Sequence, residues 1–256
     1  MHDYHVHSNY SDGTFLYHMC HAAEEAGLDG LGFADHCNVS TREPQRREKQ
    51  MFGFNLDATY ERRRAGIEAI RDKFGLRVYD AVEMDYLPDE RDTIARFLDE
   101  ANFDYAIGSV HTVDDRNVQT TGPFREMDEP ERRAVVDAYY DALVSLVESE
   151  LFEVAAHPDL LERTTPLRGF TTEDHYRRVA EAFADSRTVP EVNAGRVLRD
   201  YGELHPKTEF YEVLREYDVE FTLGTDSHRP DEIEPRADEL DRFCAETELE
   251  PVELRV

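Results

Sequence analysis

The stretch "HVHSNYSDG", residues 5–13, places two histidines, a carboxylate and a glycine close together near the start of the chain. The first part of this stretch belongs to a β-rich segment, in which side chains two positions apart lie on the same face. His5 and His7 are therefore expected to point in the same direction. Such a pair by itself is weak evidence for a metal site, so its meaning depends on the partners that the rest of the chain supplies.

Short β-rich segments alternate with helical patterns along the whole chain. The predicted strands are Tyr4–His7, Gly30–Ala34, Arg77–Val82, Tyr105–Val110, Glu153–Ala156, Val189–Val192 and Glu220–Leu223. Alternation of strands with helices predicts parallel pairing, and seven such units fit a closed or nearly closed α/β barrel of the TIM type. No repeat, low-complexity tract or linker divides the chain, so residues 1–256 are predicted to form a single domain.

The helix between the first two strands has readable ends. Ser11 or Asp12 is expected to cap its start, and Gly27 is expected to end it. The other predicted helices are Leu56–Phe74, Asp92–Ala101, Pro130–Ser149, Thr172–Asp185, Pro206–Tyr217 and Ala237–Thr247. Two connections, Cys37–Asn55 and Thr112–Glu129, are longer than usual. Both follow strands, and long strand-to-helix loops in this architecture are typical of active-site lids.

Every predicted strand ends in a histidine, a carboxylate or an asparagine. The strand ends read "HVH" at 5–7, "ADH" at 34–36, "VEMD" at 82–85, "GSVH" at 108–111, "AAHPD" at 155–159, "EVN" at 191–193 and "GTDSH" at 224–228. In a parallel barrel these ends converge on one mouth, where active sites lie. The first histidine pair therefore has companions from all six other strands.

These strand ends supply a donor set suited to divalent metal ions. Neutral imidazole and carboxylate are ligands for Zn, Mn or Fe, and a carboxylate such as Glu83 can bridge two ions. Asp85 is an alternative to Glu83. We prefer Glu83 because it lies closer to the predicted strand end. The candidate ligands, enough for two or three ions, are His5, His7, Asp12, His36, Glu83, His111, His157, Asp226 and His228. The remaining histidines, predicted to be solvated, are His2, His18, His21, His175 and His205.

The charge balance limits the partners and the environment. Twenty-nine basic residues against 57 acidic ones give a net charge of −28, which repels nucleic acid and anionic membranes at low salt. This composition indicates a protein adapted to high salt, with an ordinary acidic protein as the alternative. No apolar run approaches the roughly 20 residues needed to span a bilayer, no secretory signal is recognisable, and the three cysteines are far apart. We therefore expect a cytoplasmic protein that does not bind membranes.

These residues, in this order, resemble the polymerase-and-histidinol-phosphatase (PHP) family of metal-dependent phosphoesterases. "HVHSNYSDG" matches the family's first motif, "DGLGFADHC" the second, "EMD" with "GSVH" the third and "GTDSH" the fourth. The resemblance covers nearly the whole chain. It implies a distorted seven-stranded β/α barrel with a two- or three-metal centre at its mouth.

Within the family the chain most resembles the monofunctional histidinol-phosphatases, through "FGFN", "YAIGSVHTVDD", "LFEVAAHPDLL" and "EVNAGRVLR". The resemblance implies three groups of metal ligands. The first comprises His5, His7, Glu83 and Asp226, the second Glu83, His111 and His157, and the third Asp12, His36 and His228.

The implied reaction is hydrolysis of a small phosphate monoester, L-histidinol phosphate, in histidine biosynthesis. A guanidinium is expected to bind the phosphoryl group, and Arg163, Arg196 and Arg199 follow predicted strands closely enough to do so. Asn193 is expected to orient a ligand or the substrate, and Ser109 to donate to phosphate. The proton for the leaving alkoxide is assigned to Asp226 or His228, without a choice between them.

Two other functions compete with this one. The first is a PHP phosphoesterase that acts on nucleotides or other small phosphate esters. The acidic charge argues against a long nucleic acid, since phosphate contacts need a basic track. The second is a non-catalytic barrel that binds metal, which would be expected to have lost ligands, and none is missing here. The oligomeric state and the identity of the metal are left open.

Overall fold

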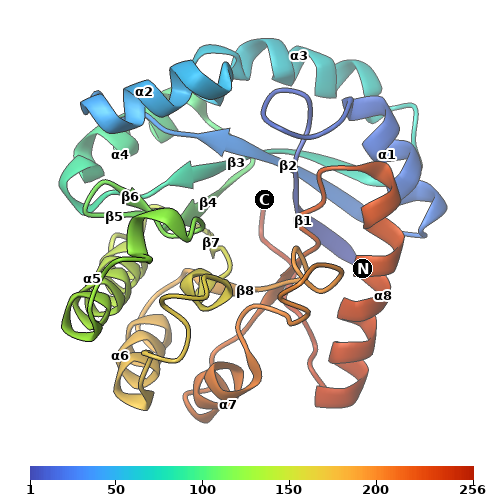
Figure 1. Ribbon diagram of the computed structural model, residues 1–256. Coiled ribbons are helices and arrows are strands. Elements are labelled where there is room, and N and C mark those ends of the chain that lie inside the picture. Colours follow the sequence, from blue (N-terminus) through green and yellow to red (C-terminus); the bar gives the residue numbers. More distant parts are fainter.

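The computed structural model describes residues 1–256 and shows a ring of parallel strands with helices around its outside (Figure 1). The strands of the main sheet are β1 (His2–Val6), β2 (Gly30–Cys37), β3 (Arg77–Asp85), β4 (Tyr105–Ser109), β7 (Val154–Ala155), β8 (Val189–Asn193) and β9 (Thr222–Gly224), paired in that order. All seven predicted strands are confirmed. The predicted α/β barrel of the TIM type is confirmed with them.

The ring is closed between its first and last strands by the segment that follows β9. The amide of Asp226 donates to the carbonyl of His5 at 2.7 Å, and the amide of His7 donates to the carbonyl of Ser227 at 2.9 Å. These bonds place the start of the chain beside residues 226–228. The first and last motifs of the sequence thus share one side of the barrel mouth.

Helices cover the outer face of the strands (Figure 1). Their bounds are α1 (Leu16–Glu25), α2 (Glu43–Phe52), α3 (Tyr60–Arg71), α4 (Arg91–Ala101), α5 (Glu129–Glu148), α6 (Glu173–Ala184), α7 (Thr208–Glu216) and α8 (Pro230–Thr247). The largest apolar cluster includes buried residues of α5, α6 and α7, and a second cluster includes residues of α1, α3 and α8. No helix is both long and apolar enough to cross a membrane.

The structure differs from the predicted elements at three places. Helix α2 lies inside the connection Cys37–Asn55, which was predicted as a loop, and α8 begins at Pro230 instead of Ala237. The connection after β4 contains a small antiparallel hairpin formed by β5 (Thr112–Val113) and β6 (Arg116–Asn117). Both long connections therefore contain ordered elements.

The predicted cap of the first helix is wrong. Helix α1 begins after Phe15 without a side-chain cap. The Ser11 hydroxyl instead donates to Asp35 at 2.6 Å, and Asp12 faces the barrel mouth among histidines. The predicted helix end is confirmed, because Gly27 follows α1 with a φ of 74°, a conformation that favours glycine.

Candidate metal centre

The candidate ligands meet at the carboxyl end of the strands, where the parallel register places them side by side. His36 of β2 pairs with Glu83 of β3, so their side chains leave the same face of the sheet at the same level. His5 and His7 are fully buried at the end of β1. Side chains that are up to 223 positions apart in the sequence thus form one cluster.

Glu83 lies at the centre of this cluster, with a ring of histidines around its two oxygens. Its Oε2 atom lies 2.6 Å from His36 Nδ1, 3.5 Å from His5 Nε2 and 3.7 Å from His7 Nε2. Its Oε1 atom lies 3.0 Å from His157 Nε2 and 3.3 Å from His111 Nε2. This arrangement is suited to a carboxylate that bridges two cations.

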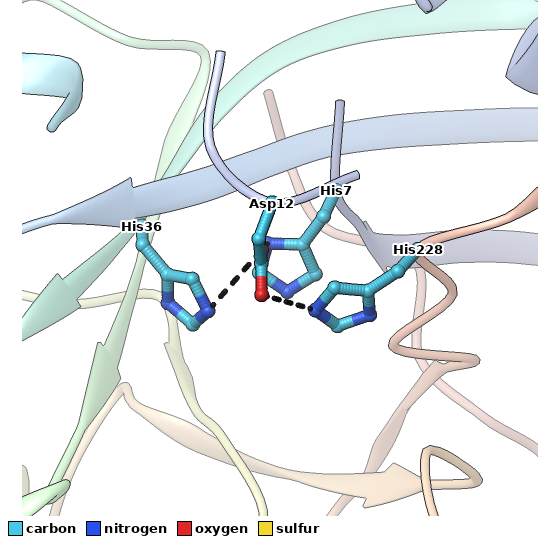
Figure 2. A group of neighbouring side chains, drawn as sticks. All are labelled: His7, Asp12, His36 and His228. Atoms are coloured by element: carbon cyan, nitrogen blue, oxygen red, sulfur yellow. Dashed lines mark ion pairs between the residues drawn. The ribbon is translucent and has the colours of Figure 1, made fainter. Parts of the chain in front are cut away.

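Asp12 forms a second focus at the edge of the mouth. Figure 2 shows its carboxylate between the rings of His36 and His228, with His7 behind it. One Asp12 oxygen lies 3.3 Å from His228 Nε2, and the other lies 3.7 Å from His36 Nε2. His36 therefore faces Glu83 with one ring nitrogen and Asp12 with the other, which joins the two foci.

Asp226 completes the side of the cluster formed by the first and last motifs. Its Oδ1 atom lies 3.3 Å from His7 Nε2. Asp226 has a φ of 51°, which turns its side chain into the mouth directly after β9. Gly195 packs against this carboxylate so closely that a Cβ atom there would collide with it. The glycine before Arg196 is thus explained by the packing of a candidate ligand.

The donor atoms fit divalent cations. The Nε2 atoms of His5 and His7 are buried and have no hydrogen-bond partner, a costly state for a polar atom unless something binds it. Ligand atoms lie within 4.8 Å of one another in three overlapping groups: His5, His7 and Glu83; His36, Glu83 and His111; and His7, Asp12, His36 and His228. The nitrogen and oxygen donors, without a thiolate, are those that Zn, Mn and Fe accept.

Comparison with known proteins identifies the family. The model of the PHP domain matches residues 3–195. This chain belongs to the PHP domain family.

Two relatives illustrate the similarity of this PHP protein to histidinol-phosphatases. A probable histidinol-phosphatase of Deinococcus radiodurans is 24% identical over 218 residues, which cover 83% of this chain and 79% of the relative. The histidinol phosphate phosphatase of Lactococcus lactis, solved in complex with Zn, L-histidinol and phosphate, is 19% identical. It superimposes with a TM-score of 0.75 over 98% of this chain and 94% of its own. The second similarity shows that the two proteins share the barrel fold.

Two carboxylates hold the outer nitrogens of ligand rings in this PHP site. His5 Nδ1 lies 2.9 Å from Glu191, and His111 Nδ1 lies 2.6 Å from Asp85. A ring that donates through Nδ1 presents Nε2 to the interior, which is the usual arrangement around protein-bound metals. Asp85 therefore supports His111, while Glu83 occupies the centre. The sequence analysis missed Glu191, although its spacing of two from Asn193 was a usable signal.

The acidic neighbours change the proton affinity of the PHP ligand rings. Burial alone lowers the pKa of His36 and of His111, but the Glu83 carboxylate outweighs it and raises their pKa values to about 9 and about 10. Burial and the charges of His228 and His36 lower the pKa of His7 to about 4. In the metal-free protein the rings of His36 and His111 are therefore among those that hold protons at neutral pH, and a cation must displace these protons to bind.

Two predicted phosphate-binding arginines lie together beside the PHP cluster without carboxylate partners. Burial and the neighbouring Arg196 lower the pKa of Arg163 to about 10. The Arg163 guanidinium donates to the Gln119 side chain, and the buried Nε atom of Arg196 has no partner. Arg199 differs, because its guanidinium donates to Glu232 at 2.5 Å. The geometry thus separates Arg163 and Arg196 from Arg199.

The two other predicted substrate contacts face ligand carboxylates. The Ser109 hydroxyl donates to Glu83 at 2.6 Å. Asn193 Nδ2 lies 3.4 Å from Asp226, and its Oδ1 atom accepts from the amide of Gly195 at 2.8 Å. Asn193 therefore contacts a candidate ligand, and Ser109 contacts Glu83; the roles expected for them toward the substrate stay predictions.

The prediction that five histidines are solvated is wrong for two of them. His205 is buried, and its Nδ1 atom lies 2.5 Å from the buried carboxylate of Asp159. His175 is also buried, and its Nε2 atom lies 2.8 Å from Asp137. In each case a carboxylate from a distant segment makes burial of the ring possible, and such a pairing is invisible in local sequence. His18 and His21 are exposed, as predicted.

Proposed function

We propose that this protein hydrolyses L-histidinol phosphate to L-histidinol and phosphate, as a step of histidine biosynthesis. The broader class, a metal-dependent phosphatase, follows from its membership of the PHP family and its similarity to histidinol-phosphatases. The substrate is supported by the L-histidinol and phosphate bound to the Lactococcus lactis protein. We expect the ligand cluster to hold two or three divalent ions.

The observation that carries the proposal is the pair of arginines beside the metal ligands. Arg163 and Arg196 line one hollow beside the ligands, and neither is paired with a carboxylate although the chain has 57 acidic and 29 basic residues. Burial, followed by repulsion from the charge of Arg196, lowers the pKa of Arg163. An anion between them would relieve this repulsion, and a guanidinium binds phosphate with two parallel hydrogen bonds. The site is therefore suited to a phosphoryl group.

The residues of the chain divide the work of hydrolysis. Divalent ions bound to the cluster supply Lewis-acid activation of water and neutralise phosphoryl charge. Arg163 and Arg196 orient the phosphoryl group for in-line attack. Asp226 and His228 lie at the mouth within 3.7 Å of each other and are the two candidates for delivering a proton to the leaving alkoxide.

The first test is phosphate release from L-histidinol phosphate compared with a panel of nucleotides. The protein is loaded with zinc or manganese, and salt is varied from low to molar concentration. We expect a strong preference for L-histidinol phosphate. Turnover of nucleotides alone would contradict the proposed substrate but would retain the class of metal-dependent phosphatase.

The second test separates an enzyme from a metal-binding scaffold. We expect His111→Ala and Asp226→Asn to abolish turnover while the circular dichroism spectrum stays unchanged. His21→Ala, at an exposed position on α1, is the matched control and is expected to remain active. Full activity of both ligand variants would contradict catalysis at this site.

A further inference from the structure

A cavity of about 280 Å³ opens between the metal-ligand cluster and helix α2. Its inner wall includes the candidate ligands His36 and His111, so a group bound in the cavity would lie directly beside the cluster. Its outer wall is formed mainly by α2 and the residues that follow it. This volume is close to the lower end of the roughly 300–1,000 Å³ that small-molecule sites occupy.

One side chain in the wall has a buried acceptor without a partner. Gln45 of α2 is only 2% exposed. Its Nε2 atom donates to Asp115 Oδ1 at 3.2 Å, whereas its Oε1 atom has no hydrogen-bond partner. An ionised carboxylate can only accept hydrogen bonds, so the side-chain amide of Gln45 must turn its nitrogen toward Asp115. The remaining oxygen is therefore an acceptor that lacks a donor.

The cavity also contains an unneutralised carboxylate. Glu48 accepts a hydrogen bond from Asn117 Nδ2 at 3.3 Å and has no cationic partner within ion-pair distance. Lys49, the basic residue of the wall, lies 3.4 Å from Asp57, which neutralises it. The part of the wall formed by α2 thus offers the negative charge of Glu48 and the unpartnered acceptor of Gln45, and its lysine is already paired.

Aromatic side chains add a flat surface to the same wall. The ring of Phe54 stacks on His36 with a centroid distance of 6.4 Å and an interplanar angle of 18°. Phe52 stacks on Phe54 at 6.0 Å and 27°, yet it is 61% exposed. Exposed aromatic faces attract planar rings and cations. The cavity is therefore suited to a cationic group with a planar part.

We propose that this cavity binds the leaving alcohol and selects alcohols that carry a cationic N–H group. The Glu48 carboxylate supplies the charge, and Gln45 Oε1 accepts a hydrogen bond. The inference rests on the proposed function in that the cluster must cleave a phosphate ester. It goes further because it names the residues that choose the alcohol. The same carboxylate would repel leaving groups that carry further phosphates, so we expect it to disfavour nucleoside di- and triphosphates.

The test compares the phosphate ester of a cationic alcohol with that of a neutral alcohol, in the wild-type protein and in one variant. L-Histidinol phosphate and phenyl phosphate are hydrolysed by the metal-loaded wild-type protein and by Glu48→Gln. Loss of one charge-assisted hydrogen bond lowers binding by about tenfold. We therefore expect kcat/KM for L-histidinol phosphate, divided by kcat/KM for phenyl phosphate, to fall about tenfold in Glu48→Gln. The fall should come mainly from a higher KM for L-histidinol phosphate. An unchanged ratio would overturn the inference.

The matched control is Glu43→Gln, which removes the same charge from the same helix outside this cavity. It is expected to leave the ratio at the wild-type value. A fall as large as that of Glu48→Gln would overturn the inference, because the acidic field of the whole protein would then attract the cation.

A binding measurement keeps this inference separate from the proposed function. The metal-loaded protein is titrated with L-histidinol by calorimetry. We expect Glu48→Gln to bind about tenfold more weakly than wild type, and Glu43→Gln to bind equally well. Equal binding by all three proteins, or none by wild type, would overturn the inference. Failure of the proposed function would be seen instead as a lack of turnover of L-histidinol phosphate by wild type.

Discussion

At the scale of single residues, the strand ends predicted the ligands because the fold itself brings those ends together. His5, Glu83 and Asp226 needed no knowledge of side-chain packing to be named. Their supporting residues did, since Glu191 contacts His5 from a strand 186 positions away. Glu191 lies inside β8 and not at its end. The strand ends therefore predicted the groups that face into the mouth, but not the role of Glu191 behind His5.

Replacement of Glu191 should weaken metal binding without removing a ligand. We expect Glu191→Gln to lower metal affinity by about 10- to 100-fold, the usual effect of losing the carboxylate behind a ligand histidine. Excess metal should restore most of the activity. Competition with a chromophoric chelator measures the affinity directly.

The control for this variant is Glu220→Gln, which removes an exposed carboxylate just before β9 at the opposite end of the barrel. It should bind metal as wild type does. If Glu191→Gln kept wild-type affinity, the support of His5 by this carboxylate would be unimportant for the metal.

At the scale of elements, the sequence predicted those that have a regular apolar pattern. Helix α2 was missed because "EPQRREKQMF", residues 43–52, has almost no apolar residues, and only Gln45 is buried. Its place over the cavity depends on tertiary contacts. The predicted helix Ala237–Thr247 lacks the first turns of α8, which begins at Pro230 and continues through Pro235, a residue that usually breaks or kinks a helix. Helix α2, which lies over the cavity, thus has a weaker local signal than the helices that cover the barrel.

A buried hydrogen-bonded pair, Asp159 and His205, joins the loop that carries Arg163 to the segment that follows Arg196. Asp159, just after β7, accepts from the amide of Lys207 at 2.8 Å and lies 2.5 Å from His205 Nδ1. His205 in turn exchanges backbone hydrogen bonds of 3.0 and 2.7 Å with Asn193. The loop with Arg163 is thereby fixed to the segment that follows Arg196.

We expect Asp159→Asn to misplace the arginines and to raise the KM for the phosphate ester by about tenfold or more. Leaving a buried polar group without its hydrogen-bond partner costs about 1–3 kcal/mol, so the melting temperature should fall as well. Steady-state kinetics below this temperature separate KM from kcat. An unchanged KM in a folded variant would mean that the loops keep their positions without the pair.

The matched control is Asp137→Asn, which removes the partner of the other buried histidine, His175. Asp137 lies on α5, and its carboxylate is largely exposed. This variant should keep the wild-type KM, even if its melting temperature falls slightly. The contrast shows whether the effect of Asp159 depends on its place between the two loops.

At the scale of the whole molecule, the sequence gives the net charge of the protein but not the positions of the charged groups on the folded surface. The structure places two free arginines at the mouth of a protein whose net charge is −28. Ion pairs neutralise part of the acidic surface, among them Arg177 with Glu173 at 2.6 Å. With nearly twice as many acidic as basic residues, most carboxylates have no such partner. Folding therefore concentrates negative charge that the unfolded chain spreads out.

This repulsion should make the stability of the protein depend on salt. The Debye length falls from about 10 Å at 0.1 M salt to about 3 Å at 1 M, so salt removes repulsion between neighbouring carboxylates of the folded state. We expect the melting temperature to rise by several degrees between these concentrations of KCl, at about 2–4 °C for each kcal/mol recovered. Calorimetry or circular dichroism measures this shift.

A variant with less acidic surface provides the control for screening. Replacing exposed carboxylates that have no cationic partner and lie far from the mouth, such as Glu212 and Glu220, by glutamine should raise stability most at low salt, because fewer charges then need screening. Its melting temperature should change less with KCl than that of wild type. An equal slope for the two proteins would show that salt acts through apolar burial instead. In that case the acidic composition would not explain stability at high salt.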